Sequence, residues 1–136
     1  MGYSKIVTWM SEYGAYLEKD AQLREERASQ KSVVIPDGIK IITSDAYKWY
    51  SSVTSITIPD SVISIEPNAF KGCSSLTEIV IPNKVTEIEA NAFSGCSSLT
   101  RVVLPESLEY IGQDAFSGCS SLTEIVIPDN VWSISY

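Results

Sequence analysis

The chain has 136 residues, of which 44% are hydrophobic and 20% are charged, and its net charge at pH 7 is −7. This composition is typical of one folded domain and excludes a disordered tail. The acidic balance disfavours direct binding to nucleic acid, which requires a basic surface.

No apolar run is long enough to span a bilayer. Residues 1–14 also lack the apolar core and the cleavage site of a secretory signal. We therefore expect a cytoplasmic protein if the chain is taken as it stands. A sequence that comes from a longer exported protein would instead be extracellular or on the cell surface.

Residues 1–34 are predicted to form an N-terminal helical cap, with the helix itself over residues 4–28. Six apolar residues recur at three- and four-residue spacing and so form one stripe on a helix: Ile6, Trp9, Met10, Tyr13, Tyr16 and Leu17. A repeat array needs such a cap because its first unit otherwise exposes the core. A partner-binding helix is the alternative, since aromatic residues and methionine are also typical of interfaces.

A 23-residue unit repeats through residues 35–136, which we predict to be one solenoid domain of four full units and a partial fifth. The units begin at Ile35, Ile58, Ile81, Leu104 and Ile127. The unit from Ile35 is the most divergent, and the unit from Ile127 stops at Tyr136.

Apolar alternation in each unit, as at Leu76, Ile79 and Ile81, predicts a short strand with one buried face. One strand per unit stacks into a parallel sheet. A proline ends every strand because it has no backbone donor: Pro36, Pro59, Pro82, Pro105 and Pro128. A second alternating pair, as at Val62 and Ile65, predicts a second and shorter row of strands.

An Asn or Asp precedes an aromatic residue in each full unit, as Asn68 precedes Phe70. We expect this residue to cap a short helical turn that buries the ring, and Gly72 to end the turn in a left-handed conformation. In the first unit Trp49 occupies the glycine position. Because tryptophan rarely adopts that conformation, we expect this corner to be reshaped and to pack against the N-terminal segment.

The block N-A-F-x-G-C-S-S-L-T-x-I-x-I-P, nearly intact from Asn68, Asn91 and Asp114, resembles the BspA-like class of leucine-rich repeats. The resemblance implies an α/β repeat fold, namely a right-handed leucine-rich-repeat solenoid with stacked parallel short strands and an N-terminal capping helix. It also implies ligand-binding and adhesion roles, many of them on bacterial or protist surfaces.

The chain contains no histidine, which removes the commonest general base and the commonest metal ligand. Its cysteines, Cys73, Cys96 and Cys119, share one column and are expected to be buried apolar filler rather than disulfides or metal ligands. No phosphate-binding glycine loop is present. We therefore expect a protein that is not an enzyme and that uses no cofactor or metal.

The outward columns of the strands are the candidate binding surface, because solenoids present such columns to partners. Threonine and valine are also simply good strand formers, so the surface could be purely structural. On residue type and position, the candidate partner-binding residues are Glu78, Val80, Arg101, Val103, Glu109, Tyr110, Glu124, Val126 and Trp132.

Residues 102–136 contain five acids and no base, which favours a protein partner with a basic surface. The first hypothesis is a protein-binding module that uses its strand face and acidic C-terminal end. The second is a small acidic inhibitor, of the phage or mobile-element type, that blocks a basic groove of a bacterial enzyme. The third is an excised or designed assembly module, or a piece of a surface adhesin.

The partial fifth unit leaves a strand edge open, and an open edge favours pairing with another chain. Three explanations remain at this point. Trp132 and Tyr136 fold over the edge, two chains pair there as a homodimer, or the array continues in a longer protein.

Overall fold

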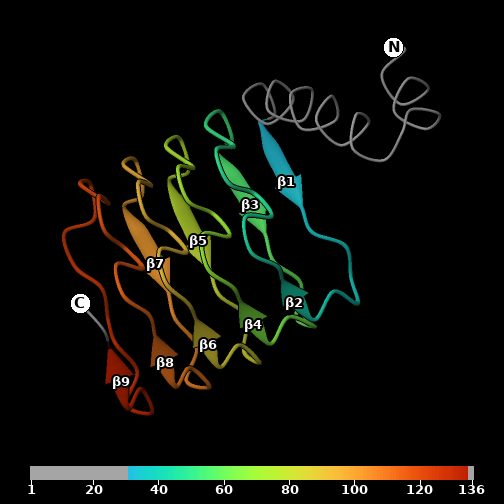
Figure 1. Cartoon of the computed structure of the whole chain (residues 1–136), viewed down its shortest axis with the longest axis vertical. Coiled ribbons are helices and arrows are strands. Elements are labelled where there is room, and N and C mark those ends of the chain that lie inside the picture. The colour runs from blue at the N-terminus through green and yellow to red at the C-terminus, as the bar shows by residue number, and fades with distance from the viewer. Residues whose placement is uncertain (1–30, 135–136) are drawn as a thin grey trace, which may run out of the picture.

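Residues 31–134 of the computed structural model form a solenoid of stacked coils built from short parallel strands and turns (Figure 1). Residues 1–30 and 135–136 are not described. The predicted helix over residues 4–28 therefore lies outside the described residues, as does most of the predicted cap. Within residues 31–134 there is no helix.

Two rows of strands run along the stack, as the repeat pattern predicts (Figure 1). The first row contains the three-residue strands β1 (Ser32–Val34), β3 (Ser55–Thr57), β5 (Glu78–Val80) and β7 (Arg101–Val103). The second row contains the two-residue strands β2 (Ile41–Ile42), β4 (Ser64–Ile65), β6 (Glu87–Ile88), β8 (Tyr110–Ile111) and β9 (Ser133–Ile134). The second row is one continuous parallel sheet in the order β2-β4-β6-β8-β9.

The first row is not continuous, so the prediction of one stacked strand in every unit is wrong in part. β1 pairs with β3 and β5 pairs with β7, but β3 and β5 do not pair. Residues 124–126, at the end of the fourth unit, form no strand. β1 lies N-terminal to residue 35, within the segment assigned to the cap, and it already pairs in the repeat register, Ser32 with Ser55. Because most of residues 1–34 are not described, the boundary between cap and solenoid stays a prediction.

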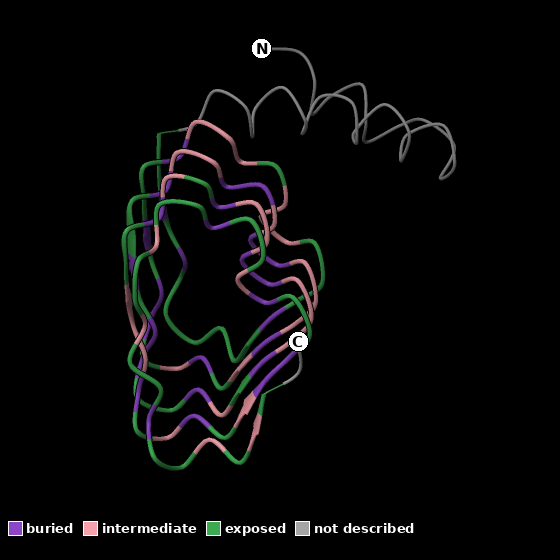
Figure 2. Cartoon of the chain, turned by 90° about the vertical axis from the view of Figure 1, so that its left-hand side faces the viewer, coloured by how far each residue is buried: buried purple, intermediate pink, exposed green. Residues whose placement is uncertain are grey.

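The buried side of each coil holds the repeated apolar columns, and buried segments recur at matching places in successive coils (Figure 2). Phe70 and Phe93 are fully buried and belong to a ladder of stacked rings. The ring centroids lie 5.6 Å apart between Tyr47 and Phe70, 5.1 Å between Phe70 and Phe93, and 5.3 Å between Phe93 and Phe116. The aromatic column is thus the centre of the core, because each ring contacts the next coil.

The Asn and Asp column does not cap a helical turn, so that prediction is wrong. Asn68 and Asn91 have φ angles of 65° and 60°, in the left-handed region, whereas a helix cap has extended geometry. Asn and Asp tolerate the left-handed region better than other side chains do. The turned backbone lets the amide of Asn68 donate to the carbonyl of Ala90 in the next coil, at 3.0 Å.

The corner at Trp49 is not reshaped, contrary to prediction. Trp49 has a φ of 68°, and its amide donates to Lys71 O at 2.8 Å, just as the Gly72 amide donates to Ser94 O. The coil-to-coil hydrogen bond therefore holds tryptophan in the glycine conformation. Its ring lies over Gly72, where a Cβ would come within 2.2 Å of the ring. The predicted contact with the N-terminal segment lies outside the described residues.

The cysteine column is buried and its thiols are free, which confirms the prediction of a thiol ladder. The Sγ atoms of Cys96 and Cys119 donate to Phe70 O and Phe93 O at 3.4 and 3.2 Å. Hydrogen bonding to Cys119 lowers the pKa of Cys96, but hydrogen bonding to Cys73 and burial raise that pKa by more, to about 12. Hydrogen bonding to Cys96, together with burial, raises the pKa of Cys119 well above its ordinary range.

The Trp49 ring over Gly72 predicts that alanine costs more stability at Gly72 than at Gly95, although both glycines have a φ of 79°. Gly95→Ala is expected to lower the free energy of unfolding by about 1–2 kcal/mol, the cost of a left-handed L residue. Gly72→Ala is expected to cost at least about 1 kcal/mol more, because its Cβ must displace Trp49. Urea denaturation measures both losses.

The control is the same pair of substitutions in a Trp49→Ala background, where the two losses should become equal. Equal losses in the parent protein would contradict the position of the Trp49 ring.

The raised thiol pKa values predict resistance to alkylation, because the thiolate is the reactive form. An unfolded thiol is about half ionised at pH 8.5, whereas Cys96 keeps its proton up to a pKa of about 12. Native protein should therefore react with iodoacetamide at pH 8.5 far more slowly than urea-unfolded protein. Equal rates in the two states would show that the column is open to solvent.

The same pKa difference makes stability depend on pH. The free energy of unfolding is expected to fall as pH rises above about 8.5 towards 12, since unfolding then releases a proton.

Candidate partner-binding surfaces

The outer positions of the first row form one candidate surface, which we call the first-row face. In β5, Glu78 and Val80 are exposed on either side of the buried Ile79. The register pairs Glu78 with Arg101 and Val80 with Val103. The face consists of Val34, Ser55, Thr57, Glu78, Val80, Arg101, Val103, Glu124 and Val126.

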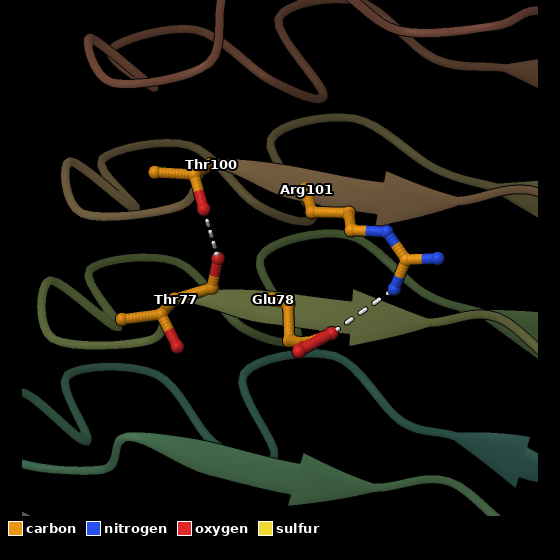
Figure 3. A network of polar contacts seen from close by, with 4 residues as sticks. All are labelled: Thr77, Glu78, Thr100 and Arg101. Carbon is orange, nitrogen blue, oxygen red and sulfur yellow. Dashed lines mark hydrogen bonds and ion pairs between the residues drawn. The ribbon is translucent and has the colours of Figure 1, made fainter.

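An ion pair joins β5 and β7 on this face (Figure 3). A guanidinium nitrogen of Arg101 lies 3.1 Å from a carboxylate oxygen of Glu78, and both side chains are more than half exposed. Beside them the Thr100 hydroxyl donates to Thr77 O at 3.1 Å. An exposed pair of this kind adds at most about 1 kcal/mol to stability. Its main effect is to hold the Arg101 guanidinium against Glu78 on the neighbouring strand.

A cleft lies beside β7, next to residues 124–126. Because residues 124–126 do not pair with β7, a cleft of about 570 Å³ lies between them. It brings together four of the predicted residues, Arg101, Val103, Glu124 and Val126. Val126 is 79% exposed, whereas Val103 is half-buried, so the three valines of this column are not equally exposed to solvent.

A second cleft, of about 400 Å³, occupies the break between β3 and β5. Glu78 and Val80 line it, together with Ser55, Thr57 and Asp60, which the sequence analysis did not select. Nothing in the columns could have signalled this break. β3 and β5 carry the same kinds of residue in the same register positions as strands that do pair.

Three predicted residues belong to the second row and not to the first-row face. The rings of Tyr110 and Trp132 are in contact, with centroids 6.3 Å apart and planes tilted by 39°. The Trp132 amide donates to Glu109 O at 3.1 Å, which fixes these two residues on adjacent coils. The structure therefore divides the nine candidate residues into two separate groups, six on the first row and three on the second.

Carboxylates also gather on the second row, where the sequence analysis singled out only Glu109. Burial raises the pKa of Glu89, and the charge and hydrogen bond of Glu87 and the charge of Glu66 raise it further. Among residues 31–134, no three acidic or cysteine side chains are grouped so that they could hold a metal ion. Nor does this part of the chain contain a helix long and apolar enough to cross a membrane.

Two solved bacterial structures resemble the solenoid. A leucine-rich repeat protein from Bacteroides ovatus is 30% identical with a TM-score of 0.72, over 77% of this chain and 27% of that one. A T. pallidum leucine-rich repeat protein is 38% identical with a TM-score of 0.72, over 76% of this chain and 50% of that one. The chain thus spans half or less of the length of these two relatives.

No protein with a curated description matches the chain. The model of the BspA type leucine-rich repeat region, in six copies, matches residues 25–136, which is most of the chain. It agrees with the 23-residue period and with the stacked parallel strands seen in the structure. The protein therefore belongs to the BspA-type leucine-rich repeat family.

Proposed function

We propose that the chain is a non-catalytic module that binds a protein through its first-row face, and that the acidic C-terminal coils select a basic partner. Leucine-rich repeat proteins generally bind proteins, and the family assignment supports that class of function here. The observation that carries the choice of surface is the cleft between β7 and residues 124–126. There, exposed apolar and charged side chains lie together beside the edge of β7 that does not pair with β5.

The affinity would come from apolar contact on this face. Val34, Val80 and Val126 are 74%, 54% and 79% exposed, so a partner can remove much of their surface from water. Fully burying one such side chain stabilises a complex by about 1.5–3 kcal/mol. Burial of the three valines would thus supply the apolar part of the affinity, against the entropy cost of association, provided that the partner's surface is complementary in shape.

The choice of partner would depend on charge. Arg101 is paired with Glu78, whereas Glu124 and Glu106, which line the same cleft, form no ion pair within residues 31–134. Unpaired carboxylates beside an apolar anchor favour a partner with lysine or arginine at the rim of its contact surface. Such rim charges act mainly on the association rate and on partner choice.

A second candidate function is inhibition of a bacterial enzyme by occupation of a basic groove. It is favoured by the exposed acids of the last coils, where residues 102–134 contain Glu106, Glu109, Asp114, Glu124 and Asp129 and no base. Both candidates predict a basic partner. They differ in that only the inhibitor abolishes the partner's activity when bound.

Photocrosslinking tests the choice of surface. Benzoylphenylalanine at Val80 or Val126 is expected to crosslink one and the same protein in the native host, because both residues lie on the first-row face. The matched control is Gln113, which is exposed on a turn, and it should not crosslink that protein. Adding Glu124→Lys to the Val80 variant should weaken the crosslink about tenfold, since it replaces attraction by repulsion in the cleft.

Crosslinking to the same protein from Gln113 as efficiently as from Val126 would contradict the proposed face. So would the absence of any crosslinked protein from both first-row positions. An assay of the captured partner's own activity, with and without the module, then separates a binding module from an inhibitor.

A further inference from the structure

The C-terminal end of the second row carries an exposed aromatic pair that the first-row face does not include. Trp132 is 74% exposed, although its ring contacts the half-buried ring of Tyr110. An exposed aromatic pair of this size offers a partner a large apolar area and a π face. The pair therefore provides a platform whose free side is the outer face of Trp132.

Two exposed carboxylates flank this platform. Glu109 lies one coil before Trp132, to which its carbonyl is joined by a 3.1 Å hydrogen bond, and directly before Tyr110 in the chain. Glu87 lies on β6 at the position that pairs with Tyr110. Neither carboxylate forms an ion pair within the described part of the chain. The platform thus combines aromatic faces with unneutralised negative charge.

A comparison within the chain shows what is missing at this platform. At the first repeat, the Lys48 ammonium lies 5.8 Å from the centre of the Trp49 ring, a cation–π contact made by the chain itself. Trp132 has no such partner among residues 31–134, and residues 102–136 contain no base that could supply one. The open Trp132 ring can therefore accept a cation from another molecule.

We propose that Glu87, Glu109, Tyr110 and Trp132, which we call the aromatic–acidic patch, bind an arginine side chain of a protein partner. The guanidinium stacks on the outer face of Trp132 and pairs with Glu109. It does not lie between the two rings, because rings in contact leave no space there. Arginine fits better than lysine, since its planar and weakly hydrated group can stack and form ion pairs together.

This patch is a surface separate from the first-row face, so either proposal can fail without the other. An aromatic platform could also stack on a sugar ring. The unpaired carboxylates favour the cation, because a neutral sugar would leave their charge uncompensated.

The test uses the full chain labelled with 5-fluorotryptophan and observed by ¹⁹F NMR, with the Trp132 signal assigned from Trp132→Phe. The probe is a capped peptide with two arginines separated by glycine, and it is compared with its lysine and citrulline counterparts. The arginine peptide is expected to shift the Trp132 signal and to leave the Trp49 signal in place. The lysine peptide should bind more weakly, and the citrulline peptide should cause no shift.

Matched variants separate the patch from general attraction between opposite charges. Glu109→Gln is expected to lower the affinity for the arginine peptide about two- to fivefold, which is the effect of one exposed charge contact. Asp37→Asn removes the same charge from an exposed turn outside both proposed surfaces and should change the affinity much less. Because Trp132 is exposed, Trp132→Leu should keep the fold, as circular dichroism can verify, and should abolish specific binding.

Three results would overturn the proposal. One is an equal response of Trp132 to the arginine and citrulline peptides. Another is an equal loss of affinity in Asp37→Asn and Glu109→Gln. The third is a shift of the Trp132 signal by cellohexaose where the arginine peptide gives none, which would make the platform a carbohydrate site.

Discussion

The hydrogen bonds that run from each coil to the next are the interaction on which the rest of this structure depends. The amides of Phe70 and Phe93 donate at 2.8 Å to Ala92 and Ala115, each one coil further on. These bonds set the register of successive coils, so residues 23 apart lie above one another. The stacked rings, the thiol ladder and the outward columns follow from that register. A repeat protein held in this way is stabilised mainly by contacts between neighbouring coils.

The sequence alone was sufficient for the parts of the fold that depend on side-chain burial. The spacing of Ile79 and Ile81 and the second pair at Val62 and Ile65 correctly predict two rows of strands around one core, although the first row is interrupted. The sequence alone was not sufficient where backbone hydrogen bonds override the conformational preference of a residue type. Trp49 keeps the left-handed φ of a glycine because its amide bonds to Lys71 O. Asn68 was interpreted as a helix cap, although the same residue type also tolerates a left-handed turn.

The outward residues of the candidate surfaces could be selected from the sequence, but the shapes of these surfaces could not. All nine selected residues are on the strand rows or beside them, yet the structure separates Tyr110 and Trp132 from the valines of the first row. The clefts arise where neighbouring coils do not pair, and the outward columns carry the same kinds of residue at paired and unpaired positions. One frame thus offers an apolar face with a charged cleft and, apart from it, an aromatic platform with carboxylates. The family accounts for the frame, while the outward residues differ from one coil of this chain to the next.

Native-state hydrogen exchange tests the dependence on coil stacking most directly. If the bonds between coils hold the fold, the amides of Phe93 and Gly95 in the central coils should exchange slowest. Protection should then fall towards Tyr47 at one end and towards Trp132 at the other. Equal protection along the stack, or stronger protection of the turn amides within a coil than of the amides between coils, would contradict this account.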